Sequence, residues 1–131
     1  MIKSKNLDPE AGRWYVKRLV AQDAVQNVLQ NPTGKPCIIT RCVLHIITET
    51  ATGGTTADIG VNATSATTND SLLDGVAVTT AGVFDNIINK GSNGKEIKLL
   101  PAGNYVTADL SGAASGLIAD VYVQLKQLNA A

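Results

Sequence analysis

Residues 100–125 read LPAGNYVTADLSGAASGLIADVYVQL, two runs of alternating apolar and polar residues joined by a segment of small residues. A period of two is expected of a half-buried β-strand, because successive side chains of a strand point to opposite faces. No catalytic residue type is concentrated here, so the pattern predicts packing and not chemistry. In the second run, the residues predicted to face the core are Leu117, Ala119, Val121, Val123 and Leu125, and those predicted to face outward are Asp120, Tyr122, Gln124 and Lys126.

The chain has 131 residues, of which 44% are hydrophobic and 17% are charged. This length suits one domain with a sizeable core. The charged share lies below the ~25% of typical soluble domains, so much of the surface is expected to be neutral and polar. We predict an N-terminal arm over residues 1–13 and a single β-sandwich domain over residues 14–131.

The strongest strand signal lies in residues 37–50, CIITRCVLHIITET, which are rich in β-branched residues. Both faces of this strand are substantially apolar. Such a strand is expected to be buried on one side and covered by an arm or a neighbouring subunit on the other. Alternation places Ile38, Cys42, Leu44 and Ile46 on the core face, and it predicts self-association through Ile39, Val43 and Ile47.

The other segments also favour strands. Residues 14–29 fit either a helical stripe or two short strands, of which we favour the strands. Residues 70–75 fit a single helical turn capped by Asp70, and residues 91–94 carry an Asn-Gly signal for a hairpin turn. Short strands without a βαβ rhythm predict an all-β fold, an antiparallel β-sandwich of the jelly-roll type. Further strands are expected at residues 56–61, 76–78, 82–88, 95–100 and 104–110.

Charge is distributed unevenly, although the net charge is zero. Residues 1–41 hold seven Lys and Arg against three acidic residues, whereas residues 42–131 hold four against eight. A basic N-terminal arm could bind an acidic protein surface or nucleic acid, or it could be a solvated face. The rest of the chain lacks basic clusters with interleaved aromatic residues, the stacking platforms of nucleic-acid sites, so we expect no nucleic-acid partner.

The cysteines and the apolar segments bear on redox chemistry and membranes. Cys37 and Cys42 would lie about 16 Å apart along one strand, too far for a disulfide. Their odd spacing predicts opposite faces, with Cys42 in the core, and it does not fit a metal site. No signal peptide is visible and no run approaches the ~18 apolar residues of a membrane span, so we expect synthesis in the cytoplasm and no membrane partner.

The inventory of catalytic residue types is short. His45 is the one histidine, and its nearest acid in sequence, Glu49, would lie about 13 Å away along a strand. No G-x-S-x-G elbow occurs. The loop carboxylates Asp58, Asp70, Asp74 and Asp85 fit turn and cap roles better than a calcium loop, although a calcium site among them is the minor alternative. We therefore expect no enzymatic activity, no cofactor and no metal.

Several of these segments together resemble small virion proteins encoded in the structural gene clusters of tailed bacteriophages. The resemblance runs from Cys37 to Tyr122 and rests on CIITRCVLHIITETATGGTTADIGV, SLLDGVAV, AGVFDNI, GSNGK and LPAGNYVTADLSGAASGLIADVYV. The basic segment from Lys3 to Arg18 has no counterpart in this resemblance, and the cysteine pair is peculiar to this chain. These motifs are turn and core patterns, so they bear more on the fold than on a place in the particle.

The resemblance implies a jelly-roll-like β-sandwich that decorates or cements a capsid, commonly as a trimer. The implied partners are the major capsid protein and further copies of the chain, and the implied location is the capsid surface of a virion assembled in the host cytoplasm. Trp14 either anchors the shell contact or caps the core of its own domain. An alternative role is a receptor- or glycan-binding head of a fibre or spike. The residues expected to contact the shell are Arg13, Trp14, Tyr15, Lys17 and Arg18.

Overall fold

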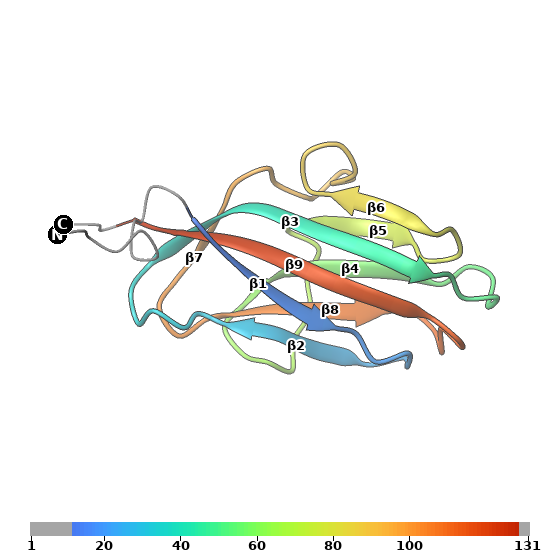
Figure 1. The fold of residues 1–131 in the computed structure, drawn as a ribbon. Helices are drawn as coiled ribbons and strands as arrows, with labels where there is room; N and C mark the ends of the chain where they lie inside the picture. Colours follow the sequence, from blue (N-terminus) through green and yellow to red (C-terminus); the bar gives the residue numbers. More distant parts are fainter. Residues whose placement is uncertain (1–11, 129–131) are drawn as a thin grey trace, which may run out of the picture.

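The computed structural model describes residues 12–128, and these form nine β-strands and no helix (Figure 1). The predicted all-β class is confirmed, and so are the two short strands expected within residues 14–29. Among the described residues, no helix is long and apolar enough to cross a membrane. The strands are β1 (Arg13–Arg18), β2 (Val25–Gln30), β3 (Cys37–Thr48), β4 (Thr56–Asn62), β5 (Leu73–Ala77), β6 (Gly82–Asp85), β7 (Lys98–Leu100), β8 (Tyr105–Leu110) and β9 (Ile118–Gln127).

The strands form two antiparallel sheets that pack face to face. Sheet A has the order β1-β9-β3-β6, with β7 also paired to β3, and sheet B has the order β2-β8-β4-β5. The predicted antiparallel β-sandwich is therefore confirmed. Of the arm predicted over residues 1–13, residues 1–11 lie outside the described residues, and Arg13 already belongs to β1.

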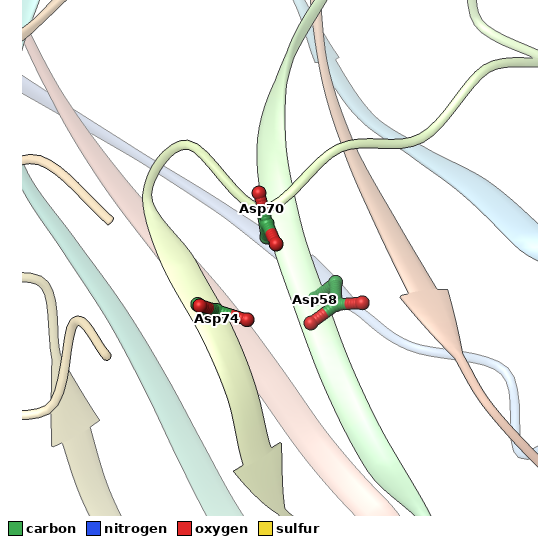
Figure 2. A group of neighbouring side chains, drawn as sticks. All are labelled: Asp58, Asp70 and Asp74. Atoms are coloured by element: carbon green, nitrogen blue, oxygen red, sulfur yellow. The ribbon is translucent and has the colours of Figure 1, made fainter. Parts of the chain in front are cut away.

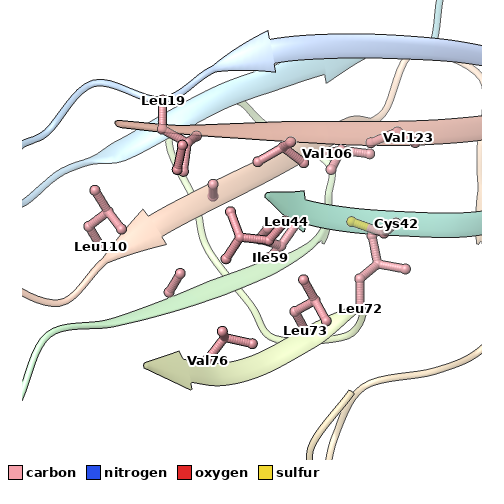
Figure 3. Close-up of a cluster of buried hydrophobic side chains, with 14 of the residues drawn as sticks. Leu19, Cys42, Leu44, Ile59, Leu72, Leu73, Val76, Val106, Leu110 and Val123 are labelled. Carbon is pink, nitrogen blue, oxygen red and sulfur yellow. The ribbon is translucent and has the colours of Figure 1, made fainter. Parts of the chain in front are cut away.

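The core lies between the two sheets (Figure 3). In β9 and the residue before it, the alternation predicted from the sequence is confirmed, because Leu117, Ala119, Val121, Val123 and Leu125 are all buried. They meet residues of β4 and β8 such as Ile59 and Val106. Each fully buried aliphatic side chain of this kind contributes roughly 1.5–3 kcal/mol. Hydrophobic burial across the sandwich thus holds the sheets together without a disulfide, since Cys37 and Cys42 are both free.

A β-bulge in β3 corrects the predicted assignment of its two faces. Opposite β9, the register shifts between Ile39 and Arg41, so one extra residue is inserted at Thr40. A bulge reverses the alternation beyond it. Ile39 and Cys42 consequently both point into the core and are fully buried, whereas Ile38 lies on the outer side.

Three predictions for β3 therefore fail for one physical reason. Ile39 does not share the outer face with Val43 and Ile47, because its side chain is in the core of its own domain. Ile38 does not share the core face with Cys42. The two cysteines do not point to opposite faces, because both are fully buried. Burial also raises the pKa of the Cys42 thiol to about 12, so this thiol stays protonated and unreactive.

Two local predictions about turns are also wrong. Residues 70–75 form no helical turn, because the Asn69 side chain accepts the backbone N–H of Ser71 and the chain then enters β5. Both Leu72 and Leu73 are thereby buried. The Gly91–Gly94 segment forms a turn, but it does not join a hairpin, since β6 and β7 both pair with β3 and not with each other.

β6 and β7 lie end to end along the same side of β3. β6 pairs with Val43–Ile46 and β7 with Cys37–Ile39, so residues 86–97 leave the sheet and return to it. Asn86, which is fully buried, fills the gap. Its backbone N–H donates to the carbonyl of Cys42, and its side-chain oxygen accepts the Cys42 N–H at 2.8 Å. Its amide nitrogen donates to the carbonyls of Lys95 and Glu96, both at 2.9 Å.

Replacing Asn86 by alanine should destabilise the domain by about 3 kcal/mol, because it leaves a buried N–H and two carbonyls without partners. The measurement is the free energy of unfolding in urea. Asn27→Ala, at an exposed position of β2, is the matched control and should change stability by less than about 0.5 kcal/mol. A loss below about 1 kcal/mol for Asn86→Ala would show that Asn86 does not join the two halves of this edge.

Candidate functional site

The outer faces of the two sheets differ in what covers them. On sheet B, the segment after β4 folds back over the strands, and it does so where residue 60 is glycine. A Cβ at Gly60 would lie 2.6 Å from the carbonyl oxygen of Asn69 and 2.8 Å from the nitrogen of Ser71. Thr107 beneath this segment is fully buried and donates to the carbonyl of Thr67. Sheet B therefore covers part of its outer face with its own chain.

No described segment covers the outer face of sheet A in this way, and this face is rich in apolar side chains. The pairing places Val16, Tyr122 and Val43 in one row across β1, β9 and β3. Val16 is 61% exposed. We call the whole set the sheet A outer patch, and it consists of Trp14, Val16, Val43, Ile47, Val83, Leu99, Ile118 and Tyr122.

Charged side chains beside this patch, on the same face of sheet A, form ion pairs with each other. Arg18 of β1 forms two hydrogen bonds with Asp120 of β9, at 2.5 and 3.2 Å. Arg41 of β3 donates to Asp85 of β6 at 3.0 Å. The hydrogen bond from Arg18 lowers the pKa of Asp120, and the N–H groups of Ile88 and Ile87 together with Arg41 lower the pKa of Asp85. A face that combines apolar residues, aromatic residues and Arg with few unpaired charges resembles the core of a protein–protein interface.

The structure divides the five residues that were expected to contact a shell. All five lie in β1, where alternation turns Trp14 and Arg18 to the outer face of sheet A. Trp14 is 49% exposed, which does not fit the alternative that it caps the core. Tyr15 faces inward and packs against the core, and Arg13 and Lys17 lie on the same side of the strand as Tyr15.

Of the three residues predicted for self-association, Val43 and Ile47 lie in the outer patch and Ile39 does not. Val16, Val83, Ile118 and Tyr122 were not predicted for this role. Tyr122 could have been found from the alternation in β9, which places it outward. Val16 and Val83 could not, because their places beside β9 and β3 depend on strand order.

His45 also lies on the outer face of sheet A, and the acids near it in the fold and in the sequence are bound to other groups. Across β9 its partner in register is Asp120, which Arg18 already binds. Glu49, the acid considered as its partner, accepts the backbone N–H of Ala81 at 3.2 Å. His45 is thus one more residue of the outer face of sheet A.

A group of acidic side chains lies on sheet B, where β4 meets β5 (Figure 2). Carboxylate oxygens of Asp58, Asp70 and Asp74 lie within 4.8 Å of one another. An all-oxygen set of this kind suits a hard cation such as Ca²⁺, so these three residues are the ones that could hold a metal in the described part of the chain.

Each of the three carboxylates also accepts a hydrogen bond from the protein. Asp58 accepts the N–H of Gly75 at 2.7 Å. Asp74 accepts the backbone N–H of Asn93 at 3.1 Å, and Asp70 accepts its side-chain amide at 2.9 Å. Asp70 and Asp74 therefore attach the segment between β6 and β7 to sheet B, whereas Asp58 joins β4 to β5.

The chain was compared with known proteins. It matches no family model and no curated protein sequence. It is similar in fold to a chain in the capsid of Ralstonia phage GP4, with a TM-score of 0.63 and 15% identity over 88% of this chain and 84% of that one. It is also similar to a chain in the acidic stable capsid of Helicobacter pylori bacteriophage KHP30, with a TM-score of 0.56 and 15% identity over 87% and 86%. Both come from phage capsids. At this identity, the likeness shows a shared fold.

Asp58 should make the domain less stable as it ionises. Burial and the neighbouring Asp70 and Asp74 raise its pKa above 3.8, against the effect of the Gly75 hydrogen bond. The folded state thus holds this proton more tightly, and stability is lost as the pH rises past 3.8. Asp58→Asn should therefore raise the melting temperature at pH 7, and this gain should vanish below about pH 4.

Asp85→Asn is the control of opposite sign. The pKa of Asp85 is lowered, so its carboxylate contributes stability above 3.8 that is lost as the pH falls through the folded-state pKa. This variant should melt below the wild type at pH 7. If Asp58→Asn also melts lower at pH 7, a bound cation or the Gly75 hydrogen bond outweighs the burial and repulsion that raise the pKa of Asp58.

Proposed function

We propose that this chain is a structural protein of a bacteriophage virion that decorates or cements the capsid surface. In this role it contacts the major capsid protein, associates with further copies of itself as a trimer, and performs no catalysis. The observation that carries the proposal is the sheet A outer patch, an apolar face with mutually paired charges on a fold shared with chains of two phage capsids. Synthesis in the host cytoplasm belongs to the same proposal.

We also infer that the sandwich is a jelly roll, and the strand order supports this. If β6 and β7 count as one interrupted edge strand, each sheet has four strands. Consecutive strands then alternate between the sheets, except for β4 and β5, which are neighbours in sheet B, and this is the order expected of two Greek keys. The edge strands β1 and β2 follow each other in the chain, as do β5 and β6. Such double-sheet folds occur in many viral capsid domains.

The outer patch divides into two regions that suit two partners. Trp14 and Val16 lie on the β1 side beside Arg18, and we assign the shell contact to this region. Val43, Ile47 and their neighbours lie on the β3 side, and we assign self-association to them. Aromatic residues and Arg supply a large share of interface energy, which supports Trp14 as the anchor.

The aromatic residues give little support to a glycan-binding head. A sugar site usually needs aromatic platforms gathered in one place. Here Tyr15 and Phe84 pack against the core, Tyr105 lies on sheet B, and Trp14 and Tyr122 remain on the outer face of sheet A. The spread of these residues over both sheets and the core favours the structural role.

Trp14→Ala should reduce binding to the shell by at least about tenfold while changing the free energy of unfolding by less than about 1 kcal/mol, because its side chain is half exposed. The measurement is cosedimentation with particles assembled without this protein. Tyr105→Ala, an aromatic deletion on sheet B, should bind as the wild type does. Equal binding by the wild type and Trp14→Ala would contradict the anchor role, and no binding by the wild type would contradict the proposed function.

Val43→Asp should abolish self-association, because it places a charge in the apolar row beside Tyr122, at the position paired with Asp85. Light scattering should give the wild type a mass three times the 13.6 kDa of one chain and the variant the mass of one chain. Asn27→Asp on β2 is the control and should remain trimeric. A wild type that is a monomer both in solution and on the shell would contradict the trimer.

A further inference from the structure

We propose that β1 is a docking edge for an extended acidic segment of the shell protein, which would add to sheet A as an extra antiparallel strand. The inference deepens the proposed function and rests on it for the identity of the partner. It differs from a contact through side chains alone, because the affinity would come from main-chain hydrogen bonds along the edge.

The first observation is the position and regularity of β1. It lies at the end of sheet A, and no other described strand pairs with its far side. Its six residues pair with β9 in an unbroken register from Arg13 opposite Leu125 to Arg18 opposite Asp120. The edge therefore has no bulge that would prevent a further strand from adding.

The second observation is which main-chain groups face outward from the edge. Leu19 continues the same register opposite Ala119, and its N–H donates to the carbonyl of Ala119 at 2.9 Å. In an antiparallel ladder, bonded pairs alternate with pairs whose N–H and C=O groups point away. The N–H and C=O groups of Trp14, Val16 and Arg18 consequently point away from β9, toward the open side.

Charge identifies the kind of strand that fits. β1, with the sequence RWYVKR, carries three cations and no acid, and Asp120 of β9 pairs with one of the three, Arg18. Pairing with β1 of a second copy would bring a surplus of cations into one ribbon, and like charges in cross-strand pairs are destabilising. Edge Lys and Arg are a known protection against such self-pairing, but they do not exclude an acidic strand.

The side chains on both sides of β1 suit the same occupant. Lys17 is exposed and forms no ion pair with a described residue, so it can meet an incoming carboxylate. On the outer face, Val16 and Trp14 are 61% and 49% exposed and offer apolar contact to alternate residues of an added strand. An extended segment that alternates acidic and β-branched residues matches this pattern.

The probe for the test is the peptide Ac-TEVEVET-NH2, with Ac-TKVKVKT-NH2 as the charge-reversed control. Trp14 is the one tryptophan of the chain, so its fluorescence reports on the edge directly. The acidic peptide should shift the emission saturably, and the basic peptide should not. No shift up to about 1 mM acidic peptide, or equal shifts with both peptides, would overturn the proposal.

Val16→Pro separates strand addition from charge attraction. Proline at residue 16 removes the N–H that points to the open side and leaves the hydrogen bonds to β9 intact. Edge strands tolerate proline at positions of this kind. It should weaken binding of the acidic peptide by at least about tenfold, whereas Val16→Thr, which keeps the N–H, should not. Equal binding by Val16→Pro and Val16→Thr would overturn main-chain pairing.

Amide hydrogen exchange of the wild type provides a test that does not depend on any variant folding. The acidic peptide should slow exchange at Trp14, Val16 and Arg18 and leave Tyr15 and Lys17 unchanged, since the latter amides already face β9. The proposal would be overturned if the peptide slowed exchange at neither set of amides. It would also be overturned if a dimer that forms without the peptide already protected Trp14, Val16 and Arg18. The experiment contains no shell, so its failure is distinct from a failure of the cosedimentation assay.

Discussion

The pairing of β3 with β9 is the interaction on which the rest of the structure depends. Both strands are central in sheet A, and the bulge at Thr40 decides which side chains of β3 enter the core. With the bulge, Cys37 and Ile39 join Cys42, Leu44 and Ile46 inside, so β3 lines the core along most of its length. The same irregularity lies beside the gap between β6 and β7, where the buried Asn86 supplies the hydrogen bonds that a continuous strand would have made.

This arrangement gives the sandwich two unlike outer faces. Sheet B carries Asp58 and Asp109 opposite each other, and burial together with nearby acids raises the pKa of both. None of the described ion pairs involves sheet B, whereas two of them cross sheet A. Burying the paired charges of sheet A costs desolvation energy, but less than burying carboxylates that have no cationic partner. An acidic face gains from remaining in water, which supports the proposed contact through sheet A.

Local sequence patterns were sufficient to predict the strands. The face that some side chains occupy and the grouping of residues distant in the sequence depended on long-range strand pairing. The strict alternation in β9 and the β-branched residues of β3 were sufficient to predict both elements and the core face of β9. The sequence does not reveal the bulge at Thr40, because threonine is also common in regular strands. Ile39 was therefore assigned to the wrong face. Trp14 and Arg18 were predicted as contact residues from their residue types, because aromatic residues and Arg suit interfaces. Which of the five residues face outward depended on the pairing of β1 with β9. The nearness of Asp58 to Asp70 and Asp74 depended on the pairing of β4 with β5.

The most direct test of this account is hydroxyl-radical footprinting of the chain on purified particles, compared with the free chain. Tyr122 and Tyr105 form a matched pair, since one lies on the outer face of sheet A and the other on that of sheet B. If sheet A meets the shell, particle binding protects Tyr122 and Trp14 from oxidation and leaves Tyr105 unchanged. Protection of Tyr105 with Tyr122 and Trp14 still reactive would contradict it, because sheet B would then be the face that meets the shell.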